Sequence, residues 1–399
     1  MIRLFKFIGV FFLTAIIIFG IVIGWNWKTF SVFLDNREAI LEGNEWIIKT
    51  SSLKGLSEYI AENPDHSSIT SIVLDQPDSL IYYRGNQERT QGTTANFFIL
   101  LAYAIEIDRG NLTADEWIEW DQVDRYQLPD VEDSNHSETY QTAVERGWII
   151  DDTITVENSL SLLAQYNDLA LADYLWWNLD PDIWNTIKND LNIMKTDMPL
   201  PFSGLYLSIS PEIQSINSEE ISEIFDENSR ELWRDHVIQQ SNLYATIGAE
   251  RDQIVDYLSR NRLGITFMQE RDGMTFFPKT TSDEMTNILQ KLVRHELMNQ
   301  NVSEMVLNFM RWPMKYQSGI ESDFNDYGAL YDNRMGLMNG IDFGTSAYTG
   351  DTTVQAFYLD MLPIGFWFHA SGGHMHQDFM QRMIYDPALI HQINSVLNN

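Results

Sequence analysis

The sequence predicts an α+β protein, built as one compact unit behind a single N-terminal transmembrane helix, and three observations support this. Strand-like segments lie toward both ends of the chain, the middle is mostly helical, and an apolar run opens the sequence. Strands that are distant in the chain must pair to bury their apolar faces. We therefore expect one sheet made from both ends of the chain, with an all-helical subdomain inserted at about residues 91–260.

The N-terminal apolar run covers residues 7–27, FIGVFFLTAIIIFGIVIGWNW, and follows Arg3 and Lys6. About 20 apolar residues span a bilayer core, and positive charges before a span favour a cytoplasmic N-terminus. A cleaved signal peptide has a shorter apolar region, of about 7–15 residues, and then a small-x-small cleavage site, which this stretch lacks. The sequence predicts, in order, a cytoplasmic tail at 1–6, an uncleaved membrane anchor at 7–27, a juxtamembrane linker at 28–45 and a periplasmic or extracellular domain at 46–399.

The composition excludes several classes of function. The 399 residues include 57 Asp and Glu against 26 Lys and Arg, giving a formal net charge of -31, and there is no cysteine. So acidic a chain repels phosphate backbones, which excludes nucleic-acid binding through a basic surface. Without cysteine there is no disulfide, thiolate nucleophile or cysteine-ligated metal. We expect a membrane contact through the N-terminal span, no nucleic-acid partner and no cofactor.

The periodicity of apolar residues places the main elements. Residues 69–74 and 80–83, joined by Gln76-Pro77-Asp78, predict a β-hairpin. Residues 94–108 are apolar almost all round, which predicts a helix buried in the middle of the protein and ended by Gly110. Further helices are expected at 46–62, 113–120, 155–178, 181–191, 282–312 and about 375–396, and further strands within 329–349 and 353–362.

Three short stretches stand out by their order and their flanking sequence. TTAN at 93–96 opens the apolar helix, NDL at 167–169 precedes a helix of small residues, and RMG at 334–336 leads into a strand–turn–strand pattern. In position they resemble the Ser-x-x-Lys, Ser-Asp-Asn and Lys-Thr-Gly motifs of the serine β-lactamase and penicillin-binding protein family. The resemblance covers about residues 50–395. It implies an antiparallel sheet flanked by helices and a cleft lined by Thr93, Asn96, Asn167, Asp168, Arg334 and Gly336.

The residues in these stretches predict a catalytically degenerate protein. Acyl transfer needs an activated nucleophile, a group that takes its proton and a route for that proton to the leaving group. Thr93 keeps a hydroxyl, but Asn96 has no useful basicity and Asn167 cannot relay a proton as a serine does. Arg334 keeps a charge that can hold a carboxylate bidentately. We expect a pseudoenzyme that acts by binding in the cell envelope, with a cell-wall peptide or carboxylate as ligand and an envelope protein as partner.

Alternatives remain for each of these residues. Thr93 is the nucleophile if the protein is an active amidase, peptidase or esterase with an unrecognised base. Thr93 or Thr94 would instead cap the following helix, as threonine often does. Asp168 is better suited to a structural hydrogen bond than to the role of a base, and Arg334 is equally suited to an ion pair with one of the many acidic residues.

A histidine cluster near the C-terminus predicts a rival site. His369, His374 and His376 lie within eight positions and Asp378 follows, a spacing that resembles the His-x-His-x-Asp signature of metallo-β-lactamase-type hydrolases. Imidazole nitrogens bind zinc, copper and nickel. The sixth position of that signature is Phe379 rather than histidine. A metal-dependent enzyme is the second alternative, against a loop that leads into the last helix with partly exposed histidines.

Overall fold

The computed structural model describes residues 32, 34–50, 53–76, 80–131, 133–216, 230–310, 330–346, 348–373 and 375–397. The predicted membrane anchor at 7–27 lies outside these residues. Within the described ranges, no helix is both long enough and apolar enough to cross a membrane.

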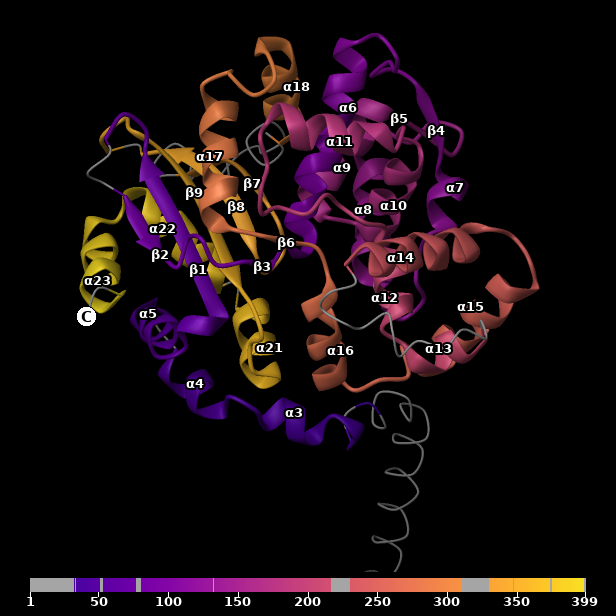
Figure 1. Cartoon of the computed structure of the whole chain (residues 1–399), viewed down its shortest axis with the longest axis horizontal. Coiled ribbons are helices and arrows are strands. Elements are labelled where there is room, and N and C mark those ends of the chain that lie inside the picture. The colour runs from indigo at the N-terminus through magenta and orange to yellow at the C-terminus, as the bar shows by residue number, and fades with distance from the viewer. Residues whose placement is uncertain are drawn as a thin grey trace, which may run out of the picture.

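A five-stranded antiparallel sheet forms one half of the molecule (Figure 1). Its order is β2-β1-β9-β8-β7, and its central strand β9 pairs with β1 on one side and with β8 on the other. The strands are β1 (Ser67–Val73), β2 (Ile81–Tyr83), β7 (Leu330–Met335), β8 (Gly340–Thr345) and β9 (Thr352–Leu359). The predicted hairpin and the predicted sheet from both ends of the chain are therefore confirmed.

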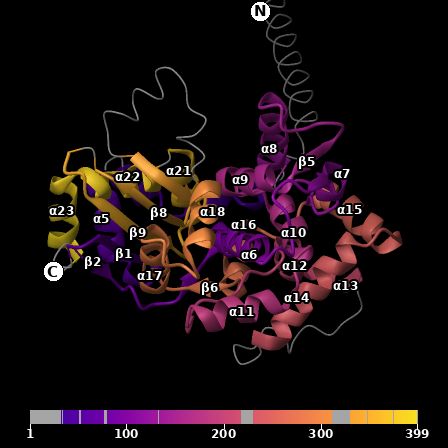
Figure 2. The ribbon, with the colours of Figure 1, turned by 90° about the horizontal axis from the view of Figure 1, so that it is seen from above.

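The sheet is covered on both faces because its strands alternate between two cores. In β9, Val354, Ala356 and Tyr358 face one core while Phe357 and Leu359 face the other. Helices α17 and α22 lie on opposite sides of the sheet (Figure 2). The covering helices are α17 (Ser282–Val293) and α18 (Gln300–Met310) on one face, and α5 (Leu53–Glu62), α22 (Met375–Tyr385) and α23 (Pro387–Leu397) on the other.

The helical half follows β2 and surrounds α6 (Asn96–Asp108), in which residues 96–106 are all buried (Figure 1). The predicted central helix is confirmed. The other helices here are α7 (Trp120–Asp124), α8 (Asp133–Glu145), α9 (Val156–Tyr166), α10 (Leu169–Trp177), α11 (Asp182–Asp190), α12 (Phe202–Ser208), α13 (Pro211–Ile216), α14 (Arg230–Ala245) and α15 (Ala249–Asn261). Two short ribbons pair β3 (Arg89–Thr90) with β6 (Lys279–Thr280) and β4 (Trp117–Glu119) with β5 (Thr153–Thr155).

Four short helices form a layer that we call the platform. They are α3 (Arg37–Leu41), α4 (Asn44–Lys49), α16 (Phe267–Gly273) and α21 (Ile364–Gly372). The chain turns sharply from α3 into α4 at Gly43, whose φ is +76°. In Figure 1 the platform lies along the lower end of the molecule.

Five predicted helices differ from the structure. The helix predicted at 46–62 is two helices, since α4 ends at Lys49 and α5 begins at Leu53. The helix predicted at about 375–396 is also two, α22 and α23, separated at Asp386. The helix predicted at 113–120 is wrong, because Trp117–Glu119 forms β4 and pairs with β5. The helix predicted at 155–178 is two helices, since Asn167 adopts the left-handed conformation and ends α9. The helix predicted at 282–312 is likewise divided, with α17 ending at Val293 and α18 beginning at Gln300.

Candidate functional site

The structure brings the three motif-like stretches together. The Leu337 N–H donates to Thr93 Oγ1 at 3.0 Å, and the Gly336 N–H donates to Asn167 Oδ1 at 3.3 Å. Thr93 lies in the short 3-10 helix Gly92–Ala95 before α6, Asn167 lies between α9 and α10, and Gly336 follows β7. The sheet and the helical half therefore meet at these residues, as the resemblance implies. The roles of the residues stay predictions.

Gly336 allows the turn after β7 to approach the helical half closely. Its φ is +99°, and a Cβ there would lie 1.9 Å from the Asn339 carbonyl oxygen and 2.7 Å from Thr94 Cγ2. Asn339 holds the same turn, because its Nδ2 donates to the Thr90 carbonyl at 2.7 Å and its Oδ1 accepts the Leu359 N–H at 2.7 Å. A side chain at position 336 would push the sheet away from Thr94.

Thr93 and Thr94 do not cap the helix, so the capping alternative is wrong. Neither the 3-10 helix nor α6 has a side-chain hydrogen bond at its N-cap. Thr94 Oγ1 instead donates to the Gln91 carbonyl at 2.8 Å. Among the residues that the structure describes, Thr93 Oγ1 hydrogen-bonds only with the Leu337 N–H, and none of these residues holds a basic side chain in hydrogen-bond contact with it.

Asn96 is buried at the start of α6, with an exposed fraction of 0%. Neither its Nδ2 nor its Oδ1 has a hydrogen-bond partner within the described part of the chain. An amide does not accept a proton near neutral pH, so Asn96 supplies neither a base nor a charge at the position where the family has lysine. The burial of an unpaired amide costs stability, and folding alone gives no reason to keep it.

Asn167 and Asp168 shape the corner between α9 and α10. Asn167 tolerates the left-handed conformation that ends α9, with φ 52°. Asp168 then caps α10, because its Oδ1 accepts the Leu171 N–H at 3.0 Å. Its Oδ2 contacts His136 Nδ1 at 2.8 Å, so both oxygens of this fully buried carboxylate are engaged away from Thr93.

His136 links Asp168 to the surface and was not predicted from the sequence. Its Nε2 contacts Asp124 Oδ1 at 3.0 Å, and its ring stacks on Trp120 with 5.7 Å between ring centroids. Burial lowers the pKa of His136, but the hydrogen bonds to Asp124 and Asp168 outweigh it and raise the pKa to about 9. His136 is therefore a cation at neutral pH that neutralises the buried Asp168.

Arg334 is described by its backbone alone. It lies in β7, where the antiparallel register pairs it with Asp342 of β8, a residue with an exposed fraction of 0%. The predicted carboxylate contact and the alternative ion pair both concern the side chain of Arg334, which lies outside the described atoms. Both stay predictions.

A cavity of about 330 Å³ lies beside Thr93, and we call it the Thr93 cavity. Most of its lining is apolar and comes from the turn after β7, the end of β9 and the platform helices α16 and α21. The apolar lining residues include Met274, Leu337, Met338, Leu359, Ile364, Trp367 and Phe368. Two charged pairs at its wall are already satisfied, since Arg262 pairs with Glu270 at 2.9 Å and Arg271 with Glu42 at 2.9 Å.

The histidine cluster is only partly described. His374 lies outside the described residues, and these contain no group of three or more side chains arranged to hold a metal ion. His376 Nε2 donates to the Leu337 carbonyl at 2.6 Å, next to the Thr93 contact. His369 lies on α21, the helix before the one that carries His376. The described contacts thus place His376 in the support of the turn after β7.

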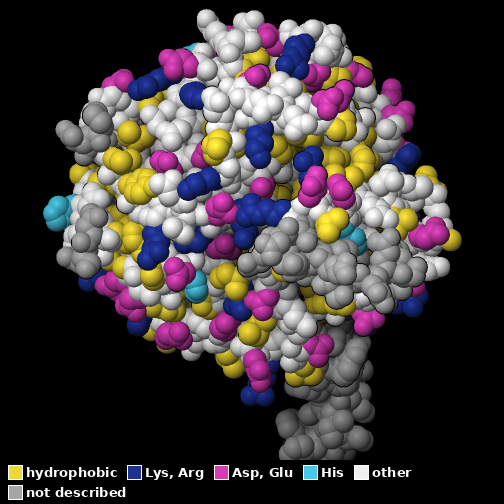
Figure 3. Space-filling model, viewed as in Figure 1, with side chains coloured by type: hydrophobic (Ala, Val, Ile, Leu, Met, Phe, Trp, Pro, Cys, Tyr) yellow, Lys and Arg dark blue, Asp and Glu magenta, His cyan; other side chains and the backbone are white. Residues whose placement is uncertain are grey.

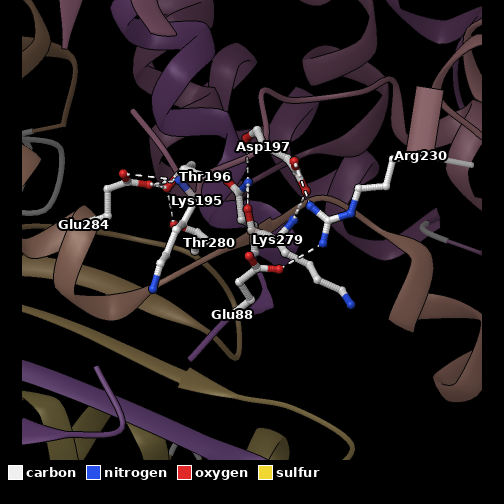
Figure 4. A network of polar contacts seen from close by, with 9 residues as sticks. Glu88, Lys195, Thr196, Asp197, Arg230, Lys279, Thr280 and Glu284 are labelled. Atoms are coloured by element: carbon white, nitrogen blue, oxygen red, sulfur yellow. Dashed lines mark hydrogen bonds and ion pairs between the residues drawn. The ribbon is translucent and has the colours of Figure 1, made fainter. Parts of the chain in front are cut away.

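A polar network fixes the chain before Thr93 (Figure 4). Glu284 accepts the N–H groups of Met194 at 2.7 Å and Lys195 at 3.1 Å, while Asp197 accepts the Lys279 N–H at 2.9 Å. Gln91 Nε2 in turn donates to the carbonyls of Asp197 and Lys279, at 2.7 and 2.9 Å. The network therefore fastens the segment that leads into the 3-10 helix carrying Thr93.

A second, larger cavity of about 620 Å³ borders this network. Arg230 lies at its wall and pairs with Glu88 at 2.9 Å and with Asp197 at 3.7 Å. Lys188, Arg234 and Lys279 also line it. Lys and Arg side chains gather near the middle of the face seen in Figure 3. This cavity shares no lining residue with the Thr93 cavity.

Comparisons with known proteins give matches among solved structures. No protein-family model and no curated protein sequence matches the chain. A β-lactamase from Sphaerobacter thermophilus DSM 20745 is 13% identical, with 83% of this chain and 97% of that chain covered and a TM-score of 0.45. The TLA-3 extended-spectrum β-lactamase is 11% identical over 88% and 100% of the two chains, with a TM-score of 0.46. PBP-A is 11% identical over 85% and 96%, with a TM-score of 0.45. The chain is similar to these proteins in fold, and what its cleft can do chemically follows from its own residues.

Proposed function

We propose that this protein is anchored in a membrane by residues 7–27, extends outside the cytoplasm and binds a ligand in the Thr93 cavity without hydrolysing it. One observation carries the proposal. Thr93 lines a largely apolar cavity, its hydroxyl accepts the Leu337 N–H, and the described residues offer that hydroxyl no hydrogen-bonded base. The predicted pseudoenzyme agrees with this geometry.

The neighbouring polar groups support binding over catalysis. A nucleophilic hydroxyl needs a base within about 2.6–3.2 Å. Asn96 is an amide without a partner among the described residues, and the carboxylate of Asp168 is engaged by Leu171 and His136. Removal of groups that act as a unit leaves only the rate enhancement that comes from binding.

The lining of the cavity supports a ligand with an apolar part. Small-molecule sites have volumes of about 300–1,000 Å³ and mostly apolar walls with a few polar groups. The Thr93 cavity, at about 330 Å³, is at the small end of that range. It suits an apolar group a few carbon atoms wide, with Thr93 as a polar contact at its wall.

Covalent trapping tests the absence of catalysis. The full chain in mild detergent is incubated with a fluorescent fluorophosphonate and, separately, with a labelled penicillin, and peptides are examined by mass spectrometry. We expect no adduct on Thr93. An adduct on Thr93 that Thr93→Ala abolishes would overturn the proposal and support the active hydrolase.

Ligand binding tests the cavity directly. Dansyl-labelled undecanoic acid is titrated into the full chain and its fluorescence is followed. We expect Met274→Trp, which fills the Thr93 cavity, to weaken binding at least about tenfold. Met198→Trp makes the same change in the larger cavity and is expected to leave binding unchanged. Equal effects of the two substitutions would contradict the assignment of the ligand to the Thr93 cavity.

Extraction and protection tests address the anchor and the location. We expect the full chain to stay with membranes after an alkaline carbonate wash. In right-side-out vesicles or spheroplasts, added protease is expected to digest residues 46–399. Release by carbonate would overturn the anchor, and protection of the domain from external protease would overturn the extracytoplasmic location.

A further inference from the structure

We propose that the platform rests on the lipid surface, with the exposed side chains of α3, α4, α16 and α21 inserted at the boundary of headgroups and hydrocarbon. The inference deepens the proposed function and rests on its membrane anchor. It assigns an interaction surface to four short helices and names a lipid bilayer as its partner.

The first observation is where exposed apolar side chains gather. Among the described residues, 16 large apolar side chains are exposed, and six of them belong to the platform or directly precede it. The other ten come from widely separated elements. The six are Leu34 (49%), Leu41 (60%), Ile48 (72%), Met268 (36%), Trp367 (40%) and Phe368 (43%). Exposed apolar surface concentrated in this way marks a contact with a partner or a membrane.

The exposed fractions along α3 and α4 show that these side chains are not needed by the core. Leu34, Leu41 and Ile48 are exposed, whereas Ala39 of α3 and Trp46 of α4 are buried. The segment therefore has two apolar faces, one packed on the domain and one open. An open apolar face on a short amphipathic segment is typical of helices that lie in a membrane interface.

Specific contacts join α3, α16 and α21, and Gly43 at the start of α4 lies close to Pro363 at the start of α21. Asn36 Oδ1 accepts the Phe267 N–H at 2.6 Å, and Glu42 Oε2 accepts from the Ile364 N–H at 3.0 Å and from Arg271. The rings of Phe267 and Phe368 lie 5.4 Å apart. Figure 1 shows all four helices at the same end of the molecule. The platform is thus fixed as a unit, and its exposed residues approach a partner together.

The length of the connecting chain selects a bilayer as that partner. Residue 27 ends the apolar run, and Leu34 is only seven residues further on. Seven extended residues span at most about 25 Å, so an anchor at 7–27 holds the start of the platform close to the membrane. Trp367 and Phe368 are side-chain types that suit this depth, tryptophan in particular because its indole is amphipathic.

Charge indicates how the surface would bind. The exposed charged side chains of α3 and α4, together with Asp35 two residues before α3, carry both signs: Arg37 and Lys49 against Asp35, Glu38 and Glu45. Such a rim gives no net attraction to anionic lipid, so insertion of apolar side chains must drive the contact. Because this rim and the whole chain are net acidic, binding is expected to be no stronger on anionic than on neutral bilayers. The Thr93 cavity, whose walls include Trp367 and Phe368, would then lie beside the lipid surface.

Site-directed spin labelling tests the inference on the full chain. Because the sequence has no cysteine, Ile48→Cys and Phe368→Cys each carry a single nitroxide. Ile247→Cys is the matched control, since Ile247 is 75% exposed and lies outside the platform, between α14 and α15. Each variant is placed in phosphatidylcholine nanodiscs, and the accessibility of the label to oxygen and to a water-soluble nickel complex is measured.

We expect labels at 48 and 368 to be several-fold less accessible to nickel, relative to oxygen, than the label at 247. Nanodiscs that contain phosphatidylglycerol are expected to give no larger difference. Equal nickel accessibility at all three positions, with the chain still bound to the discs, would overturn the platform contact and leave the anchor intact. Loss of the chain from the discs would overturn the anchor itself. Dipolar broadening that disappears on dilution with unlabelled chain would assign the surface to a second copy and overturn the lipid contact.

Discussion

At the scale of single residues, Asn96 bears most directly on the proposal that the cleft binds a ligand without catalysis. Its side chain is fully buried without a partner among the described residues, where burial of an unpaired amide costs about 1–3 kcal/mol. We predict that Asn96→Leu, a change of similar size, leaves the free energy of unfolding unchanged or raises it by up to about 2 kcal/mol. The midpoint of thermal unfolding of the full chain in detergent shows whether the substitution stabilises or destabilises the fold.

Asn167→Leu is the matched control for this prediction. It removes the acceptor of the Gly336 N–H and places a branched residue at φ 52°, so we expect the unfolding midpoint to fall. If Asn96→Leu lowers the midpoint as much as Asn167→Leu does, the amide of Asn96 makes a stabilising interaction. The prediction that folding does not need this amide would then be wrong.

His136 predicts how stability depends on pH. Its folded-state pKa of about 9 lies above the ordinary 6.5, so the protonated form stabilises the fold. This contribution is complete below about pH 6.5 and is lost as the pH rises through about 9, with a size on the order of 3 kcal/mol. We expect the unfolding midpoints of wild type and His136→Gln to differ most at pH 6 and to converge near pH 9.5. A difference that stays constant over this range would show that His136 does not titrate between Asp124 and Asp168.

At the scale of elements, the turn between β7 and β8 depends on Gly336. Its positive φ opposes any other residue, and so does the 1.9 Å distance at which a Cβ would meet the Asn339 carbonyl oxygen. We predict that Gly336→Ala lowers the free energy of unfolding by about 3 kcal/mol or more. Gly350→Ala is the control, since Gly350 has a φ of +76° with nothing within 4 Å, and it should cost only about 1 kcal/mol. Thermal unfolding measures the loss of stability in both variants. If Gly336→Ala and Gly350→Ala lose the same amount, backbone strain alone, rather than the close packing on Thr94, requires glycine at position 336.

The elements that the sequence predicted are those with a long, regular pattern. The apolar run of α6 and the seven residues of β1 are long enough to be recognised, and β2 follows β1 after a short turn. Strand β4 has only three residues, and its partner β5 begins far along the chain at Thr153, so no short turn indicates this pair. The break at Asn167 had a readable signal, an Asn that can end one helix followed by an Asp that can cap the next.

The candidate site was predictable in part for the same reason. Thr93, Asn167 and Gly336 lie at the ends of elements whose order the sequence reveals, and the structure brings them together. His136 lies in a polar stretch of α8, and nothing local indicates that its partners are at 124 and 168. The walls of the Thr93 cavity come from segments distant in the chain, so only the folded structure reveals them.

At the scale of the whole molecule, repulsion among the excess acidic residues opposes the attraction within ion pairs. Most of the described pairs have at least one partner that is more than a third exposed, such as Arg294 with Asp75 and Arg230 with Glu88. Exposed pairs contribute about 0–1 kcal/mol each and are weakened by salt. The better buried pairs, Arg262 with Glu270 and His136 with Asp168, are screened much less.

Self-repulsion should therefore dominate the response of the molecule to salt. A formal net charge of -31 opposes compaction, and the Debye length falls from about 30 Å at 0.01 M to about 10 Å at 0.1 M ionic strength. We predict that the midpoint of thermal unfolding rises with potassium chloride, most steeply below about 0.2 M, as repulsion between surface carboxylates is screened. Sucrose is the control, because it stabilises the protein by exclusion from its surface and not by screening charge. Its effect is therefore not expected to level off above a low concentration as that of the salt does. A midpoint that falls with added salt would contradict this prediction. It would show that attraction within ion pairs contributes more to stability than repulsion among the surface carboxylates removes.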